Sequence, residues 1–185
     1  MRKFSQLSGV LVATMATLFV APLFAHDKGD KSNFTTNLIG YQETPSTINS
    51  AASGEFRLNI SKDGASIKYE LSYRDLPSAI TQSHIHFGRP GLTGGVVLFL
   101  CTNLAPPAGV PLPQACPLTS ATLTGTLTAA DVIPNAGQSI DAGAAGFAEI
   151  VRAIRSGAAY ANVHTTGHPS GEIRGALGRD DDEDD

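Results

Sequence analysis

The sequence has no basic stripe, only two cysteines and, after residue 25, no long apolar run. Its formal net charge is −4, and the acidic residues at 180–185 more than account for that charge. The rest of the chain is close to neutral and offers no basic surface to attract phosphate groups, so nucleic acid is not expected as a partner. Because no second apolar run follows the first, we also expect no membrane-spanning segment after residue 25.

The beginning of the chain has the composition of a secretory signal peptide. Arg2 and Lys3 give a basic start, the stretch from Val10 to Phe24 is largely apolar, and Ala25 is a small residue suited to cleavage. The apolar stretch is shorter than the about 20 residues that span a bilayer. We therefore expect export to the periplasm or the extracellular space. The predicted divisions are a signal peptide at 1–25, a flexible N-terminus at 26–32, one domain at 33–178 and a disordered acidic tail at 179–185.

The two cysteines, Cys101 and Cys116, lie on either side of a proline-rich segment. In an exported protein, two cysteines around such a loop most often form a disulfide that fixes the loop. The alternative, a cysteine-ligated metal, is less favoured because neither cysteine has a second Cys or a His at the usual short spacing. The sequence therefore predicts a disulfide between Cys101 and Cys116.

Most of the domain alternates apolar and polar residues with a period of two, which is typical of strands. The segment 62–64, Lys-Asp-Gly, is typical of a tight hairpin turn. Only 144–157 differs, because Phe147, Ile150, Val151 and Ile154 recur at helical spacing before Gly157. We predict an all-β fold, an antiparallel Greek-key-like β-sandwich or barrel with one short amphipathic helix. The expected strands are 33–40, 54–61, 65–76, 80–88, 94–101, 121–128, 158–165 and 171–177.

The segment "SHIHFGRPG" at 83–91 places two histidines one residue apart. Because side chains at i and i+2 of a strand share a face, His84 and His86 should stand side by side. His164 ends a later strand and His168 follows in the turn, so the imidazoles could converge if the two strands are neighbours. Neutral imidazole suits copper, zinc, iron or nickel. The sequence predicts a metal site at His84, His86 and His164, with His168 as a further candidate ligand.

The histidines also have a structural interpretation, in which they line a polar cleft and form hydrogen bonds. Glu172 and Arg174 share a face of the last strand, where they could pair with each other or with a neighbouring strand. We expect them to surround the histidines in a salt bridge or hydrogen-bond network, and the alternative is an arginine that guides an anion to the site. Glu43, next to Gln42, is typical of a residue that fixes a turn.

Four blocks of the sequence resemble the CHRD domain, a module named after the animal protein chordin and found widely in bacterial exported proteins. The resemblance extends from about Phe34 to Leu177, and its most specific parts are the His-Ile-His block and the block from His164 to the Gly-Glu-Ile-Arg-Gly motif. In chordin-type proteins the module belongs to an extracellular antagonist of growth factors. The resemblance therefore implies an exported domain. The blocks are "NLIGYQETPSTINSAASGEFRLNI", "IKYELSYRDL", "SHIHFGRPGLTGGVVLFL" and "AIRSGAAYANVHTTGHPSGEIRGAL".

The pieces "HIHFG" and "NVHT" are also similar to the copper-binding segments of copper-zinc superoxide dismutases, which are Greek-key β-sandwiches. This similarity implies a copper-type site at His84, His86 and His164, with Arg174 loosely comparable to the anion-guiding arginine of those enzymes. The metal-bridging histidine and the zinc cluster of the enzymes have no counterpart in this sequence.

Three hypotheses follow for the function. The first is a binding module whose histidines hold copper, with zinc as the alternative, or recognise a protein or small-molecule partner. The second is a dismutase-like copper redox enzyme. The third is a structural or protein-interaction module without a metal. A coordination position that is open to solvent would favour the enzyme, and a closed site would favour the binding module.

Overall fold

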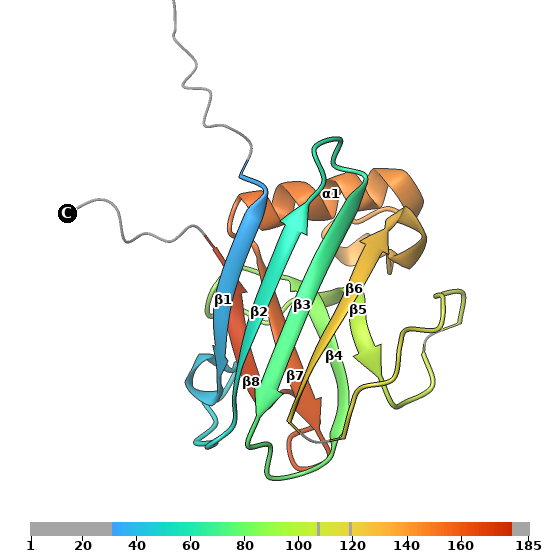
Figure 1. The fold of residues 1–185 in the computed structure, drawn as a ribbon. Helices are drawn as coiled ribbons and strands as arrows, with labels where there is room; N and C mark the ends of the chain where they lie inside the picture. Colours follow the sequence, from blue (N-terminus) through green and yellow to red (C-terminus); the bar gives the residue numbers. More distant parts are fainter. Residues whose placement is uncertain (1–30, 107, 119, 179–185) are drawn as a thin grey trace, which may run out of the picture.

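The fold is an antiparallel β-sandwich, nearly closed into a barrel, with one α-helix. We describe it from a computed structural model, for residues 31–106, 108–118 and 120–178 (Figure 1). The predicted strands are confirmed to within two residues at every end, because their periodicity matches the core face of the sheet. The elements are β1 (Asn33–Ile39), η1 (Gly40–Gln42), β2 (Ser53–Ile60), β3 (Ser66–Arg74), β4 (Ile80–Phe87), β5 (Gly95–Thr102), β6 (Ala121–Thr128), η2 (Ala129–Asp131), η3 (Ala136–Gln138), α1 (Gly143–Arg155), β7 (Ala159–Thr165) and β8 (Ile173–Leu177).

The strands form one sheet in the order β5-β4-β7-β8-β1-β2-β3-β6, and every described pairing is antiparallel. The sheet folds into two layers, with β1, β2, β3 and β6 in front of β8, β7, β4 and β5 (Figure 1). β1, β2 and β3 follow one another in the sheet, and the last strand, β8, lies beside β1. The order also makes β4 and β7 neighbours, although they lie far apart in the sequence.

Strand β7 is central to the back layer and is buried along its whole length. Ala159, Ala161 and Val163 of β7 belong to the hydrophobic core. Tyr160 and His164 therefore point to the opposite face, because side chains alternate along a strand. They are buried as well. A polar group of residues is thus enclosed on the side of the back layer that faces away from the core.

The α-helix buries Phe147, Ile150, Val151 and Ile154, as the sequence pattern predicts. It begins one residue before the predicted segment and ends at Arg155, two residues before the predicted end. Gly157 follows with a φ of 73°, a left-handed conformation that favours glycine after a helix. The predicted turn at 62–64 is also confirmed, and Gly64 there has a φ of 69°.

The predicted disulfide between Cys101 and Cys116 is present. Both cysteines are buried in the core cluster. The side chain of Asn103 strengthens the closure, since it donates to the Cys116 carbonyl at 3.0 Å and accepts from the Cys116 amide at 3.0 Å. The proline-rich loop is therefore attached to β5 at both of its ends.

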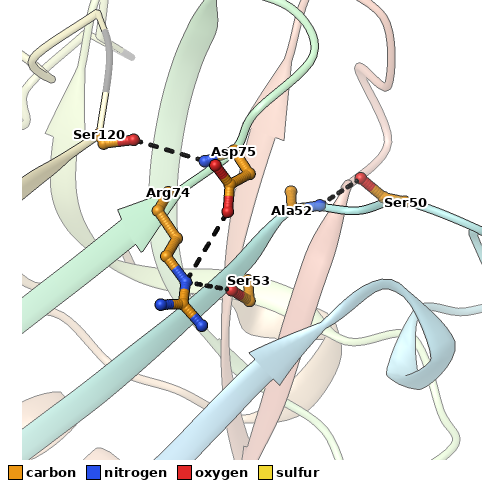
Figure 2. Close-up of polar contacts among 6 residues, drawn as sticks. All are labelled: Ser50, Ala52, Ser53, Arg74, Asp75 and Ser120. Carbon is orange, nitrogen blue, oxygen red and sulfur yellow. Dashed lines mark hydrogen bonds and ion pairs between the residues drawn. The ribbon is translucent and has the colours of Figure 1, made fainter.

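The segment that leads into β2 is held by short polar contacts (Figure 2). The Ala52 amide donates to the Ser50 hydroxyl oxygen at 3.1 Å, and Arg74 Nε donates to the Ser53 hydroxyl oxygen at 2.9 Å. Arg74 also lies 3.8 Å from the Asp75 carboxylate. These contacts fix the end of a loop that begins at η1 and covers part of the back layer near β8.

The predicted signal peptide at 1–25, most of the predicted N-terminus at 26–32 and the predicted tail at 179–185 lie outside the described residues. Among the residues that are described, no helix is long and apolar enough to cross a membrane.

Candidate functional site

The structure brings His84, His86 and His164 together. β4 pairs with β7 in a register that places His84 opposite Asn162 and Gln82 opposite His164. One ring nitrogen from each histidine lies within 4.8 Å of the other two. Nδ1 of His84 and Nε2 of His164 are 3.2 Å apart. This separation is close to the roughly 3.3 Å between two ligands of a tetrahedral ion with metal–nitrogen bonds of about 2.0 Å.

The three imidazoles are enclosed and neutral. His84, His86 and His164 are 2%, 7% and 6% exposed. Burial lowers the pKa of His84 to about 2 and that of His86 to about 4, and it also lowers the pKa of His164. His164 and His86 further lower the pKa of His84, and His164 further lowers that of His86, because a second positive charge nearby is unfavourable. At neutral pH the cluster therefore consists of uncharged imidazoles, the form that binds metals.

Two backbone carbonyls determine which nitrogens face the cluster. Nδ1 of His86 lies 3.0 Å from the Gly94 carbonyl oxygen, and Nδ1 of His164 lies 2.9 Å from the Pro169 carbonyl oxygen. A carbonyl oxygen only accepts hydrogen bonds, so both Nδ1 atoms carry the proton and both Nε2 atoms carry the lone pair. Metal-binding histidines in proteins are usually oriented in this way.

Two nitrogens of the cluster lack a hydrogen-bond partner. Nε2 of His84 and Nε2 of His86 are buried, and neither has a partner among the residues that the structure describes. Nε2 of His164 lies 3.2 Å from Nδ1 of His84 and 2.9 Å from the side-chain amide of Asn162, which must present its NH2 group to a nitrogen that carries a lone pair. A buried polar atom without a partner loses its hydration, so such atoms require an explanation.

Arg174 lies beside the cluster, over the Tyr160 ring that stacks on His86, whereas Glu172 bonds to residues outside the cluster. The Glu172 carboxylate, which is fully buried, accepts from Ser50 at 2.7 Å and from Thr165 at 2.6 Å. The Arg174 guanidinium donates to the Thr44 hydroxyl and to the Leu92 carbonyl. The sequence left open whether Glu172 and Arg174 pair with each other or with neighbouring segments. In the structure, each of them bonds to neighbouring segments.

Sequence reasoning missed Glu43, which we expected to fix a turn. Its side chain is buried, and Oε1 has no hydrogen-bond partner among the described residues. Burial raises the pKa of Glu43 to about 7, although the nearby Arg174 guanidinium partly offsets this effect. Its carboxylate occupies the space that a side chain at Gly171 would fill, with Oε2 2.6 Å from the position of a Cβ there.

Tyr160 and Asn162 were missed as well, although the sequence held a signal for them. They stand four and two positions before His164 on one strand, so the period of two places them on its face. His168 is not part of the group of three, and its backbone closes the turn after β7 by accepting from Thr165 and Gly171. Its role as a ligand stays a prediction.

The comparison with protein families matches residues 34–177 to the CHRD domain. No curated protein and no solved structure matches the chain.

Proposed function

The chain belongs to the CHRD domain family, and from this premise we propose that it is an exported binding module whose His84, His86 and His164 hold a transition metal ion. Copper is the first choice and zinc the alternative, because neutral imidazole suits both ions. Arg174 and Glu172 then serve as the surrounding hydrogen-bond network.

The observation that carries the proposal is the group of three buried, neutral imidazoles, whose ring nitrogens lie within 4.8 Å of one another and of which His86 leaves Nε2 unpartnered in the part of the chain that the structure describes. Nδ1 of His84 lies 3.2 Å from Nε2 of His164, and Nε2 of His86 has no partner among the described residues, so lone pairs on these three nitrogens would stay unsatisfied unless a cation or a donor lies between them. A metal ion satisfies all three at once. The carbonyl partners of His86 and His164 hold the rings in the tautomer that this requires.

The burial of the histidines favours a binding module over the dismutase-like redox enzyme. That alternative needs a coordination position that substrate can reach. The imidazoles are at most 7% exposed, and the Arg174 guanidinium, which would guide an anion, is engaged by Thr44, Leu92 and Tyr160. The third possibility, a structural or protein-interaction module, predicts that the histidines contribute only hydrogen bonds.

The place of action is outside the cytoplasm, in the periplasm or the extracellular space. The Cys101–Cys116 disulfide supports this, because disulfides persist in oxidising compartments. The family and the composition of residues 1–25 agree with it.

Calorimetric titration of the metal-free protein with Cu(II) and with Zn(II) tests the proposal. His84→Ala, His86→Ala and His164→Ala should each weaken binding by more than the roughly 10–100-fold that the loss of an outer hydrogen-bond partner costs. His26→Ala is the control, because His26 precedes the matched domain and is not a predicted ligand.

Equal and weak metal uptake by all four variants would contradict the proposal. The structural alternative would then be favoured, and it predicts a loss of about 1 kcal/mol of stability for each removed hydrogen bond, with or without metal.

A further inference from the structure

Tyr160 lies between His86 and Arg174 in a three-layer stack. The His86 and Tyr160 rings are nearly parallel, with an interplanar angle of 6° and centroids 4.6 Å apart. On the other face of Tyr160, the guanidinium carbon of Arg174 lies 3.4 Å from the ring centroid. A guanidinium over an aromatic face is attracted to the ring, and the attraction increases when the pair is shielded from water. Arg174 is 2% exposed and Tyr160 is 2% exposed.

The same two residues hold the loop at 88–94, which connects β4 to β5. Arg174 Nη2 donates to the Leu92 carbonyl at 2.8 Å and lies 3.5 Å from the Arg89 carbonyl. The Tyr160 hydroxyl oxygen accepts from the Gly94 amide at 3.2 Å. The loop is therefore tied to β7 and β8 at its middle and at its end.

Gly94 connects this loop to the histidine cluster. Its amide donates to Tyr160, and its carbonyl accepts from Nδ1 of His86 at 3.0 Å. A Cβ at Gly94 would stand 1.8 Å from the Phe87 carbonyl oxygen, so a residue with a side chain cannot take this position without a shift of the backbone. Because the backbone at Gly94 lies so close to Phe87, the Gly94 carbonyl oxygen is held within hydrogen-bond distance of Nδ1 of His86.

We infer that Arg174 and Tyr160 are positioning residues of the metal site, which fix the plane of the His86 ring and, through Gly94, its tautomer. Tyr160 supplies a flat surface for the ring, and Arg174 holds both Tyr160 and the loop in place. As a result, Nε2 of His86 is the nitrogen that faces His84 and His164. This inference rests on the proposed metal-binding function, but its first consequence, the tautomer of His86, exists before any metal is bound.

The test compares the wild type with Tyr160→Phe and Arg174→Lys. Tyr160→Phe keeps the stacked ring and removes only the hydroxyl that holds Gly94. Arg174→Lys keeps the charge and loses the planar fork that bonds Thr44 and Leu92 together. Tyr41→Phe and Arg152→Lys are the matched controls, since Tyr41 is 63% exposed and the Arg152 side chain is 69% exposed.

Two readouts are needed. Nitrogen-15 NMR of the metal-free protein reports which nitrogen of His86 carries the proton, and electron paramagnetic resonance of the Cu(II)-loaded protein reports the ligand field. We expect the proton on Nδ1 in the wild type and in both controls. In Tyr160→Phe and Arg174→Lys we expect a mixture of tautomers, an altered Cu(II) spectrum and roughly 10–100-fold weaker binding.

The two proposals fail in different ways. An unchanged His86 tautomer and an unchanged Cu(II) spectrum in folded Tyr160→Phe would overturn the positioning role, even if Arg174→Lys failed to fold. A wild type that binds neither Cu(II) nor Zn(II) would overturn the proposed function. In that case a shifted tautomer in the variants would still support the role of the stack in orienting His86.

Discussion

Acidification of the metal-free protein should destabilise it between pH 6.5 and pH 4. The perturbed groups are His84 and His86, whose folded-state pKa values are about 2 and about 4 against an ordinary value of 6.5. In this window the unfolded chain binds protons that the folded chain excludes. Stability therefore falls as pH falls, and for each such histidine the limiting slope is about 1.4 kcal/mol per pH unit.

Glu43 acts in the opposite direction over part of this window. Its pKa is raised to about 7 from 4.5, so between these values the folded chain binds a proton that the unfolded chain has lost. Its contribution stabilises the fold as pH falls, with a limiting slope of about 1.4 kcal/mol per pH unit. Since His164 is shifted in the same direction as the other two histidines, the net loss should be about 1 to 3 kcal/mol per pH unit below 6.5.

Urea unfolding followed by far-ultraviolet circular dichroism measures this effect, because the chain has no tryptophan to report by fluorescence. The samples are chelator-treated protein at pH 7, 6 and 5. His86→Ala should flatten the pH dependence, and Glu43→Gln should make it steeper, because the opposing group is removed. His168→Ala is the control. A free energy of unfolding that stays constant or rises from pH 7 to pH 5 would refute the assignment of buried, neutral imidazoles.

Two further predictions concern the framework of the site. Cys101→Ser should lower the free energy of unfolding by about 3 kcal/mol, because the disulfide closes a loop of about 15 residues. Urea unfolding under non-reducing conditions measures this loss. An unchanged midpoint would show that the loop is held without the disulfide. Gly171→Ala should destabilise by about 1–3 kcal/mol, because the φ of 129° is unfavourable for alanine and its Cβ would meet the Glu43 carboxylate. Glu43→Ala in the same chain should restore part of that loss in thermal unfolding, and no restoration would show that the backbone strain alone is responsible.

The strands could be predicted from the sequence because one face of each strand packs against the core. Apolar residues on that face therefore alternate with polar residues on the other face. β3 shows this clearly, with Ile67, Tyr69, Leu71 and Tyr73 all buried. The alternation of apolar and polar residues did not predict that β4 pairs with β7. That pairing depends on how the strands are ordered in the sheet, and the sequence offered convergence of the histidines only as a possibility.

The surroundings of the histidines were harder to predict than the histidines themselves. Glu43 and Thr44 lie on a loop, and nothing in their local pattern shows that the loop folds over the back layer. The stack of His86, Tyr160 and Arg174 joins three strands, so it exists only once the sheet has formed. Short-range periodicity indicates the face of a residue but not the neighbour that it meets across strands.

The most direct test of the account is the metal content of the untagged protein purified from the compartment to which it is exported. Without a tag, no added histidine contributes to the measured metal. We predict a single copper or zinc ion per chain in the wild type and its loss in His84→Ala, since His84, His86 and His164 bind the ion together. Protein that is folded and carries no transition metal, or a His84→Ala variant that keeps its metal, would contradict the claim that these three histidines form a metal site.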